Sequence, residues 1–310
     1  MDSNKKENFV VQIEMDHLGL YVQDLEKTIS WYNEYLGFRL SDYLPKGNKE
    51  EPVAPDGIAW MRYGKWHHDL TLIQVPDEAM KQNEDKLLSN LKEICFFANS
   101  KKSLEGIYDK LTSSQVISEL KFDSSSETSE FLTQDPDKNK IKILHDPSVK
   151  KLKVENFFSQ INSLSHVTIW SKNTDIARKW YQNNLDLKEK TGSKIESVKM
   201  TNAQGETKLI IDQTPEEWLN RSLSFNGRGT LQQIALKVKS EKKLLDSYDL
   251  LVKNEVEIVQ SPRPQNWSSG TKFYFLDTDK IKIEIETGMK SVEDSYGSGY
   301  EIIKKLNLLH

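Results

Sequence analysis

The segment HLGLYVQDLEKTISWYNEYLGF, residues 17–38, predicts a strand followed by an amphipathic helix. Its first six residues form a short apolar and aromatic run, which is typical of a strand. Asp24 then stands where a helix N-cap is expected, and Gly37 follows the last helical residue as a C-terminal stop. Between them, apolar positions recur at helical spacing at Leu25, Thr28, Ile29, Tyr32 and Leu36.

The same pattern returns later in the chain, which indicates an internal repeat. Residues 165–189 match residues 16–40 at a constant offset, so that His17 aligns with His166. The Trp-Tyr pair of the helix also recurs, and its spacing predicts that both rings pack in the core. A sparse match whose most informative residues coincide favours duplication over chance.

Two further pairs of segments support the duplication. Residues 94–111 match 234–251, and residues 135–144 match 277–286, in the same order along the chain. The last pair begins with Asp-x-Asp, which is typical of a turn before a strand. The whole chain is therefore a duplicated unit of about 145 residues, as expected for a repeat protein.

Each half divides again into a strand, a helix and further strands. The predicted fold class is α+β, with four βαβββ modules. We expect two domains of two modules each, residues 11–146 and 163–290. The sequence leaves open whether the modules pair within each half.

Composition excludes several classes of function. The 310 residues include 43 Lys and Arg against 47 Asp and Glu, so the net charge of −4 argues against a nucleic-acid binder. Cys95 is the only cysteine, which excludes a disulfide within the chain and any thiolate cluster. No run is long enough for a membrane helix, and the first ten residues lack a signal-peptide core. We expect a cytoplasmic protein with a small-molecule partner, and self-association into a homo-oligomer is left open.

The paired βαβββ modules resemble the vicinal oxygen chelate superfamily, which contains glyoxalases, bleomycin-resistance proteins and extradiol dioxygenases. Residues 17–38 look like its first strand and helix, and DPDKNKIKIL at 135–144 looks like its terminal strand. The resemblance covers residues 15–287, and four modules are the layout of a type I extradiol dioxygenase. It implies sheets curved into cups, whose first and last strands carry metal ligands.

The resemblance also implies a metal site in the second half. Its ligands would be His166, Gln233 and Glu284, holding Fe(II) or another divalent metal such as Mn or Zn. Tyr274 would stand beside them as a catalytic residue. A ligand set of two histidines and one carboxylate is typical of non-haem iron oxygenases. Here Gln233 replaces the second histidine, and Ser269 stands where these enzymes commonly place an acid–base histidine.

The first half offers a second candidate site at His17, His68 and Glu93. Lys142 occupies the position that matches Glu284, and a lysine there would repel a metal ion. His67 and His68 would point to opposite faces if both lay on a strand, so at most one would enter a shared cup. A structural alternative exists for Glu284 as well, because Lys282, Glu284 and Glu286 share one strand face and could form a charged surface ladder.

Three functional hypotheses follow from these residues. The first is a metal-dependent oxidoreductase that resembles the extradiol ring-cleaving dioxygenases and acts on a catechol-like or other small chelating substrate. The second is a degenerate family member that binds a small molecule without turnover, because Gln233, Ser269 and Lys142 each replace an expected group. The third and weaker one is a glyoxalase-like lyase.

Overall fold

The computed structural model describes residues 14–47, 54, 56–76, 90–114, 128–149, 159–218, 230–265 and 270–292. Its elements confirm the predicted α+β class and the repeated order of strand, helix and strands. Ser269 lies outside the described residues. Within these residues, no helix is both long and apolar enough to span a membrane.

The first module realises the predicted strand and helix. Asp24 caps helix α1 by accepting a hydrogen bond from the backbone N–H of Lys27, and Gly37 ends the helix with a left-handed φ of 73°. The elements are β1 (Glu14–Val22), α1 (Leu25–Leu36), β2 (Arg39–Leu44), β3 (Ile58–Arg62) and β4 (Leu70–Gln74).

The third and fourth modules repeat this order, and the second shows two strands after its helix within the described residues. The second contains β5 (Leu91–Ala98), α3 (Lys101–Ser113), β6 (Ser129–Gln134) and β7 (Lys140–His145). The third contains β8 (Ile161–Ser171), α4 (Thr174–Leu185), β9 (Lys188–Glu189), β10 (Ser197–Thr201), β11 (Thr207–Gln213) and a 3-10 turn (Glu216–Trp218). The fourth contains β12 (Leu231–Lys237), α5 (Glu241–Lys253), β13 (Ile258–Pro264), β14 (Thr271–Leu276) and β15 (Lys282–Thr287).

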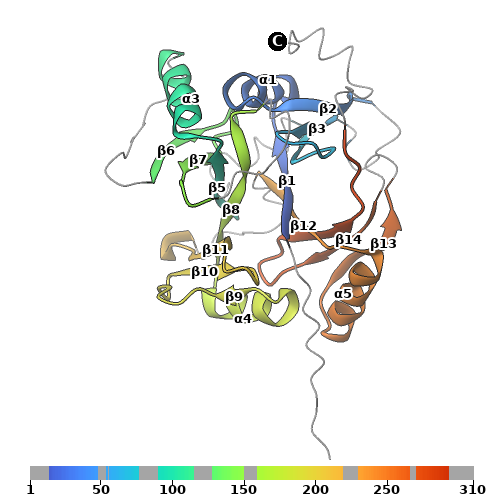
Figure 1. Cartoon of the computed structure of the whole chain (residues 1–310). Helices are drawn as coiled ribbons and strands as arrows, with labels where there is room; N and C mark the ends of the chain where they lie inside the picture. Colours follow the sequence, from blue (N-terminus) through green and yellow to red (C-terminus); the bar gives the residue numbers. More distant parts are fainter. Residues whose placement is uncertain are drawn as a thin grey trace, which may run out of the picture.

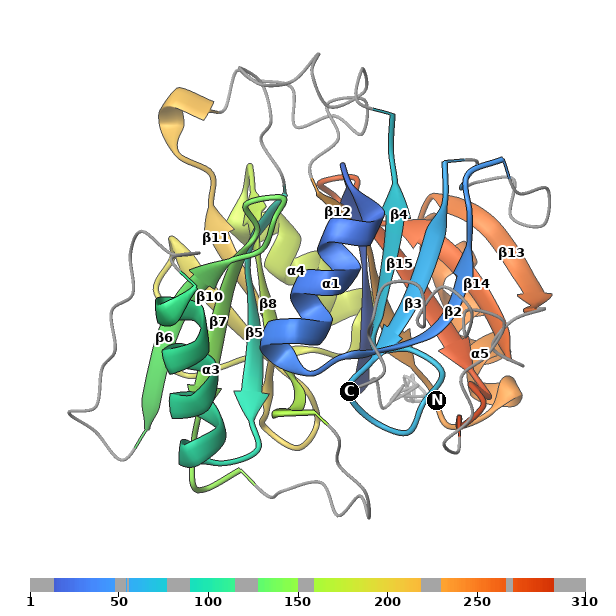
Figure 2. The same ribbon diagram turned by 90° about the horizontal axis from the view of Figure 1, so that it is seen from above.

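The modules pair across the two sequence halves. One eight-stranded sheet has the order β13-β14-β15-β12-β1-β4-β3-β2, so it joins the fourth module to the first. A seven-stranded sheet has the order β6-β7-β5-β8-β11-β10-β9 and joins the second module to the third. Among the described strands, neither the half 11–146 nor the half 163–290 forms a sheet of its own. Figure 2 shows the strands of the two sheets on either side of helix α1.

The strand registers show that the two sheets pair their first strands at equivalent positions. Gly19 lies opposite Gln233 where β1 pairs with β12, and Thr168 lies opposite Glu93 where β8 pairs with β5. These are the same positions of the repeat. Each sheet therefore brings together the first strands of two modules at an equivalent place, and any site built there has a counterpart in the other sheet.

The repeated Asp-x-Asp turns connect the modules of one half. Asp135 accepts a hydrogen bond from the hydroxyl of Tyr32 at 3.1 Å, and Asp277 accepts one from Tyr181 at 2.7 Å. The phenols come from helices α1 and α4, so the predicted turn also holds a helix of the neighbouring module. Both tyrosines and Trp31 are buried, as the sequence predicts for the Trp-Tyr pairs, and Trp180 is partly buried against the core.

The loop between β3 and β4 is held from two sides. The Asp69 carboxylate accepts hydrogen bonds from the backbone N–H groups of Tyr63, at 2.8 Å, and Gly64, at 3.1 Å. The segment 288–292 after β15 runs beside the same loop, where the N–H of His67 donates to the carbonyl of Lys290 at 3.0 Å. The first module therefore presents residues 64–69 in a fixed conformation next to the end of the fourth module.

Candidate metal centre

Three central strands of the eight-stranded sheet carry the polar groups of the site. His17 lies on β1, Gln233 on its antiparallel neighbour β12, and Glu284 on β15, which runs parallel to β12. In Figure 1, β1 and β12 lie side by side at the centre of the molecule. All three side chains are buried, with exposures of 1%, 4% and 0%. This burial excludes a surface ladder at Glu284.

The polar atoms of these residues converge on one imidazole nitrogen. The amide nitrogen of Gln233 lies 3.3 Å from Nε2 of His17 and donates a short hydrogen bond to Oε2 of Glu284. That carboxylate oxygen lies 3.9 Å from the same Nε2. The repeat position predicted for the ligand His166 is therefore filled in this sheet by its counterpart, His17.

His166 itself belongs to the other sheet. It lies on β8 and pairs with Cys95 of β5, so the topology places it apart from Gln233 and Glu284. Burial, followed by the charges of Lys142, Lys199 and Lys208, lowers its pKa to about 4. The predicted ligands came from modules three and four. The eight-stranded sheet joins module four to module one instead, so His17 and not His166 lies in the cluster.

The seven-stranded sheet carries the remaining predicted site residue of the first half. Glu93 occupies the position of Gln233, and its carboxylate lies 3.4 Å from Nζ of Lys142. Glu130 lies 3.5 Å from the same ammonium group. Burial opposes the charge of Lys142, but Glu93 and Glu130 outweigh it and raise the pKa of the lysine. The structure therefore separates Glu93 from His17 and His68 and pairs it with a lysine.

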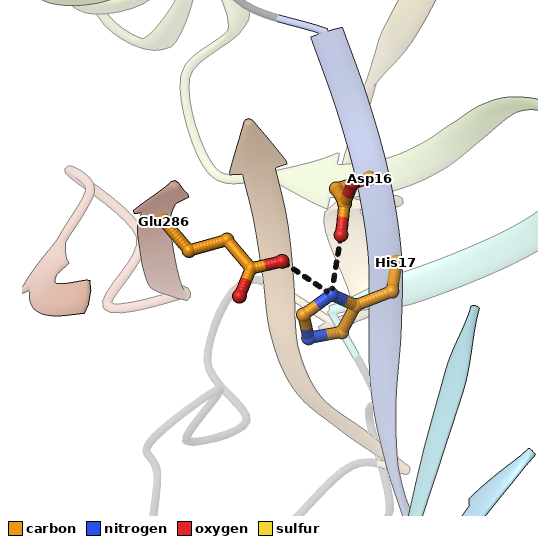
Figure 3. A group of neighbouring side chains, drawn as sticks. All are labelled: Asp16, His17 and Glu286. Atoms are coloured by element: carbon orange, nitrogen blue, oxygen red, sulfur yellow. Dashed lines mark hydrogen bonds and ion pairs between the residues drawn. The ribbon is translucent and has the colours of Figure 1, made fainter. Parts of the chain in front are cut away.

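Two carboxylates fix the other nitrogen of His17. Figure 3 shows Asp16 and Glu286 directed at Nδ1, with oxygen distances of 3.0 and 3.5 Å. Burial opposes a charge on His17, but the bonds to Asp16 and Glu286 outweigh it and raise its pKa to about 10. Burial, followed by repulsion from Asp16, raises the pKa of Glu286 to about 8. The surroundings of His17 thus favour a positive charge at this imidazole.

A chain of hydrogen bonds reaches His17 from the β3–β4 loop. His68 places Nε2 3.3 Å from Nε2 of His17, and its Nδ1 lies 3.0 Å from Nδ1 of His67. His67 in turn places its Nε2 3.0 Å from the Asp42 carboxylate. Both loop histidines are buried and precede β4, so the strand alternation expected for this pair does not apply to them.

Tyr274 and Lys272 lie beside Glu284 on the neighbouring strand β14. Tyr274 lies directly opposite Glu284 in the β14–β15 pair, and Nζ of Lys272 lies 3.7 Å from Oε1 of that carboxylate. Burial, followed by the charge of Glu284, raises the pKa of Tyr274 well above its usual range. The phenol therefore keeps its proton and can donate a hydrogen bond.

The positions of these nitrogen and oxygen atoms suit a divalent cation. A divalent ion binds imidazole nitrogen at about 2.1 Å, so two imidazole ligands on neighbouring positions lie roughly 3.0–3.4 Å apart. The Nε2 atoms of His17 and His68 have this separation. Asp16, His17 and Glu286 also each offer one possible ligand atom, and these three atoms lie within 4.8 Å of one another. Because Asp16 accepts the Nδ1 proton of His17, we interpret these two carboxylates as partners that orient the imidazole.

Asp16, Asp42, His67 and Glu286 belong to the cluster, although the sequence patterns do not predict them as its members. Asp16 and Glu286 lie one and two residues from His17 and Glu284, and this proximity is their signal in the sequence. Asp42 lies on β2, far from His67 in sequence, and only the tertiary structure brings their side chains together.

A separate cavity lies between the two sheets. It is lined by apolar side chains such as Met15, Tyr181, Ile234 and Ile283. Ile234 and Ile283 are sequence neighbours of Gln233 and Glu284 and point to the opposite face of the sheet, because side chains alternate along a strand. The cavity is therefore not part of the cluster around His17.

The fold is similar to those of solved structures at low sequence identity. A Bacillus subtilis protein described as a “putative dioxygenase” matches with a TM-score of 0.67 and 15% identity over 94% of this chain and 88% of that chain. Glyoxalase I from Zea mays matches with a TM-score of 0.59 and 15% identity over 96% of each chain. At this identity the likeness establishes the fold alone. A comparison with curated proteins found no match.

A family model matches the chain twice, over residues 14–143 and 163–285, and these ranges follow the two halves of the repeat. Together they span most of the 310 residues. The resemblance inferred from the strand and helix motifs is thus confirmed: the chain belongs to the Glyoxalase/Bleomycin resistance protein/Dioxygenase superfamily.

Proposed function

We propose that this protein is a metal-dependent oxidoreductase of the extradiol ring-cleaving type, acting on a catechol-like or other small chelating substrate. The observation that carries the proposal is the buried convergence of His17, Gln233 and Glu284 on one point of the eight-stranded sheet. The similarity in fold to a “putative dioxygenase” supports it.

The donor groups suit a divalent metal ion such as Fe(II), with Mn(II) or Zn(II) as alternatives. His17 offers Nε2, Glu284 offers a carboxylate oxygen, and rotation of the Gln233 amide offers its oxygen in place of nitrogen. Such an ion supplies Lewis acidity toward two adjacent oxygen atoms of a substrate. With one carboxylate among the donors, the loaded site keeps a positive charge, which favours an ionised diol over a neutral molecule.

The surrounding residues have distinct roles in this proposal. Asp16 and Glu286 hold the Nδ1 side of His17, so the imidazole cannot turn away from the site. Tyr274 keeps its phenol proton beside Glu284 and can donate it in a hydrogen bond to a substrate oxygen. Lys272 balances part of the charge of Glu284 and limits the motion of that carboxylate.

The test combines metal analysis with an oxygen-uptake assay. Protein reconstituted anaerobically with Fe(II) should bind about one equivalent and consume dioxygen with catechols, and the product mass should equal that of the substrate plus both oxygen atoms. His17→Ala should lose the metal and the uptake. His166→Ala, which removes the equivalent imidazole of the other sheet, should keep both.

The same assay separates the alternatives. Isomerisation of a thiol adduct of a ketoaldehyde without oxygen uptake would favour a glyoxalase-like lyase. Calorimetric binding of a diol without any product would favour a non-catalytic binding protein. Failure of the wild-type protein to bind Fe(II), Mn(II), Co(II) or Zn(II) would refute the metal site itself.

A further inference from the structure

The eight-stranded sheet lacks an imidazole where the family pattern expects its second one. Gln233 stands there, and an amide is a weaker ligand for a divalent transition metal than an imidazole. The structure brings another imidazole to the same point by a different route. His68 enters from the loop before β4 and places Nε2 3.3 Å from Nε2 of His17.

Hydrogen bonding determines which nitrogen of His68 carries its proton. The Asp42 carboxylate accepts a proton from Nε2 of His67, so in a neutral His67 the other nitrogen is an acceptor. That nitrogen lies 3.0 Å from Nδ1 of His68, which must therefore be the donor. The proton of His68 is then on Nδ1, and the lone pair on its Nε2 is directed at His17.

The same reasoning applies to His17 from the opposite side of the site. The Asp16 carboxylate accepts the proton of Nδ1 at 3.0 Å. Because Asp16 and Glu286 favour a charged imidazole, the second proton of His17 is on Nε2, on the side of His68. That proton lies between the two Nε2 atoms, which are 3.3 Å apart, and a metal ion that displaced it would meet one nitrogen lone pair from each imidazole. Glu284 adds a negative charge 3.9 Å from the same atom of His17.

The loop that carries His68 is rigidly built, as a metal ligand requires. Asp69 holds the loop through the backbone N–H groups of Tyr63 and Gly64, and the segment 288–292 holds it from the outer side. His68 is 4% exposed and His67 is 1% exposed. Neither imidazole is a surface side chain that happens to lie near the site.

We propose that His68 is a metal ligand and supplies the second imidazole of the centre in place of position 233. His17, His68 and Glu284 then form a set of two imidazoles and one carboxylate, and Gln233 becomes a hydrogen-bonding neighbour of Glu284. Asp42 and His67 are positioning residues, because they act on the metal only through the tautomer and orientation of His68. This inference rests on the proposed metal site and specifies its ligands.

The test uses Co(II) titrations of the metal-free full chain, followed by the visible absorption bands of the ion. His68→Ala and the larger His68→Gln should each weaken binding by at least about 100-fold, more than the loss of an outer partner usually does. Free imidazole should restore the wild-type bands in His68→Ala, which a merely misfolded variant would not show. Gln233→Ala should weaken binding less than either His68 variant does, because its amide is a hydrogen-bonding neighbour of Glu284 in this ligand set.

The positioning role of Asp42 has its own variant and control. Asp42→Asn removes the carboxylate that fixes the His67 tautomer, and should weaken Co(II) binding roughly 10- to 100-fold. Asp135→Asn changes a buried carboxylate of the second module that bonds to Tyr32 and lies outside the cluster. It should leave Co(II) affinity and the absorption bands unchanged.

Three outcomes would overturn the inference. If the His68 variants bind Co(II) as wild type does, His68 is not a ligand, while the proposed metal site still stands. If Asp16→Asn and Glu286→Gln abolish binding and the His68 variants do not, the metal lies on the Nδ1 side of His17. If the wild-type protein binds no metal, a shared proton occupies the space between the imidazoles and the proposed function fails too.

Discussion

Lys142 occupies in the seven-stranded sheet the position that Glu284 occupies in the eight-stranded sheet. Lys142 is in register with Cys95 of β5, and Glu284 is in register with Ala235 of β12, so the two residues are equivalent by strand pairing. The ammonium group of Lys142 lies beside Glu93, the counterpart of Gln233. The seven-stranded sheet thus carries a lysine charge at this position. We propose that a metal ion supplies the positive charge at the equivalent position of the eight-stranded sheet.

Lys142→Glu should create a second metal site. The substitution would place two carboxylates, Glu93 and the new glutamate, near His166 without the cation that now balances them. Co(II) bound at saturation should rise from about one to about two equivalents by elemental analysis, as expected for a site of imidazole and carboxylate donors. Lys142→Met removes the charge but adds no ligand, so it should stay near one equivalent. A value near one for Lys142→Glu would show that the backbone symmetry does not extend to side-chain geometry.

The buried Asp277 should make stability depend on pH. Burial, followed by repulsion from Asp279, raises its pKa from 3.8 to about 7. The folded protein therefore holds a proton at this site between about pH 4 and 7 that the unfolded chain has lost. Stability should fall as pH rises through this window, by at most about 1.4 kcal/mol per pH unit from this group.

Asp277→Asn is the variant that checks this dependence. The asparagine oxygen can still accept the backbone N–H groups of Asp279 and Ile281, and its amide can donate to the hydroxyl of Tyr181. Urea unfolding at several pH values should show a smaller slope between pH 4 and 7 for the variant. An unchanged slope would mean that Asp277 titrates normally in the folded protein.

The fold was largely predictable because it depends on local patterns that the duplication repeats. Helices α4 and α5 begin within the repeated segments 165–189 and 234–251, as four repeated βαβββ modules predict. Each has an apolar face and a side-chain N-cap, Asn173 and Ser240, and both signals lie within a few residues of the helix. Strand β8 begins at Ile161, before the repeated segment 165–189, because its pairing with β5 adds residues that carry no local signal.

The composition of the site was predictable only in part, because it depends on which modules share a sheet. The positions of Gln233 and Glu284 follow from the repeat, and they do lie together. Their imidazole partner depends on whether the first strand of module one or of module three lies beside β12, and both carry a histidine at that position. Two identical local patterns cannot distinguish His17 from His166.

Gly19 should be required for the arrangement of the glutamines. A Cβ atom at this position would overlap Oε1 of Gln232 and would lie 2.8 Å from Cγ of Gln233. Gly19→Ala should therefore displace the Gln233 side chain and destabilise the protein by about 1–3 kcal/mol, as overpacking usually does. Thermal unfolding and Co(II) absorption would detect the two effects.

The equivalent position of the other sheet is the control for this substitution. Thr168 stands there opposite Glu93, so Thr168→Ala removes atoms instead of adding them. It should not alter the Co(II) bands. Wild-type stability and wild-type bands in Gly19→Ala would show that the glutamine side chains move aside at no cost.

The segment after β15 should keep the His67–His68 loop in place. Val292 donates its backbone N–H to the carbonyl of Lys65 at 2.7 Å, and Trp66 forms a β-bridge with Ser291. A chain that ends after Gly288 loses these contacts, whereas a chain that ends after Val292 keeps them. Because the loop sets the position of His68, the shorter chain should bind Co(II) roughly 10- to 100-fold more weakly than the longer one. Hydrogen exchange should be faster at residues 64–68 in the shorter chain and unchanged in β12. Equal Co(II) affinity in the two truncated chains would mean that Asp69 and the bonds within the loop are sufficient to hold His68.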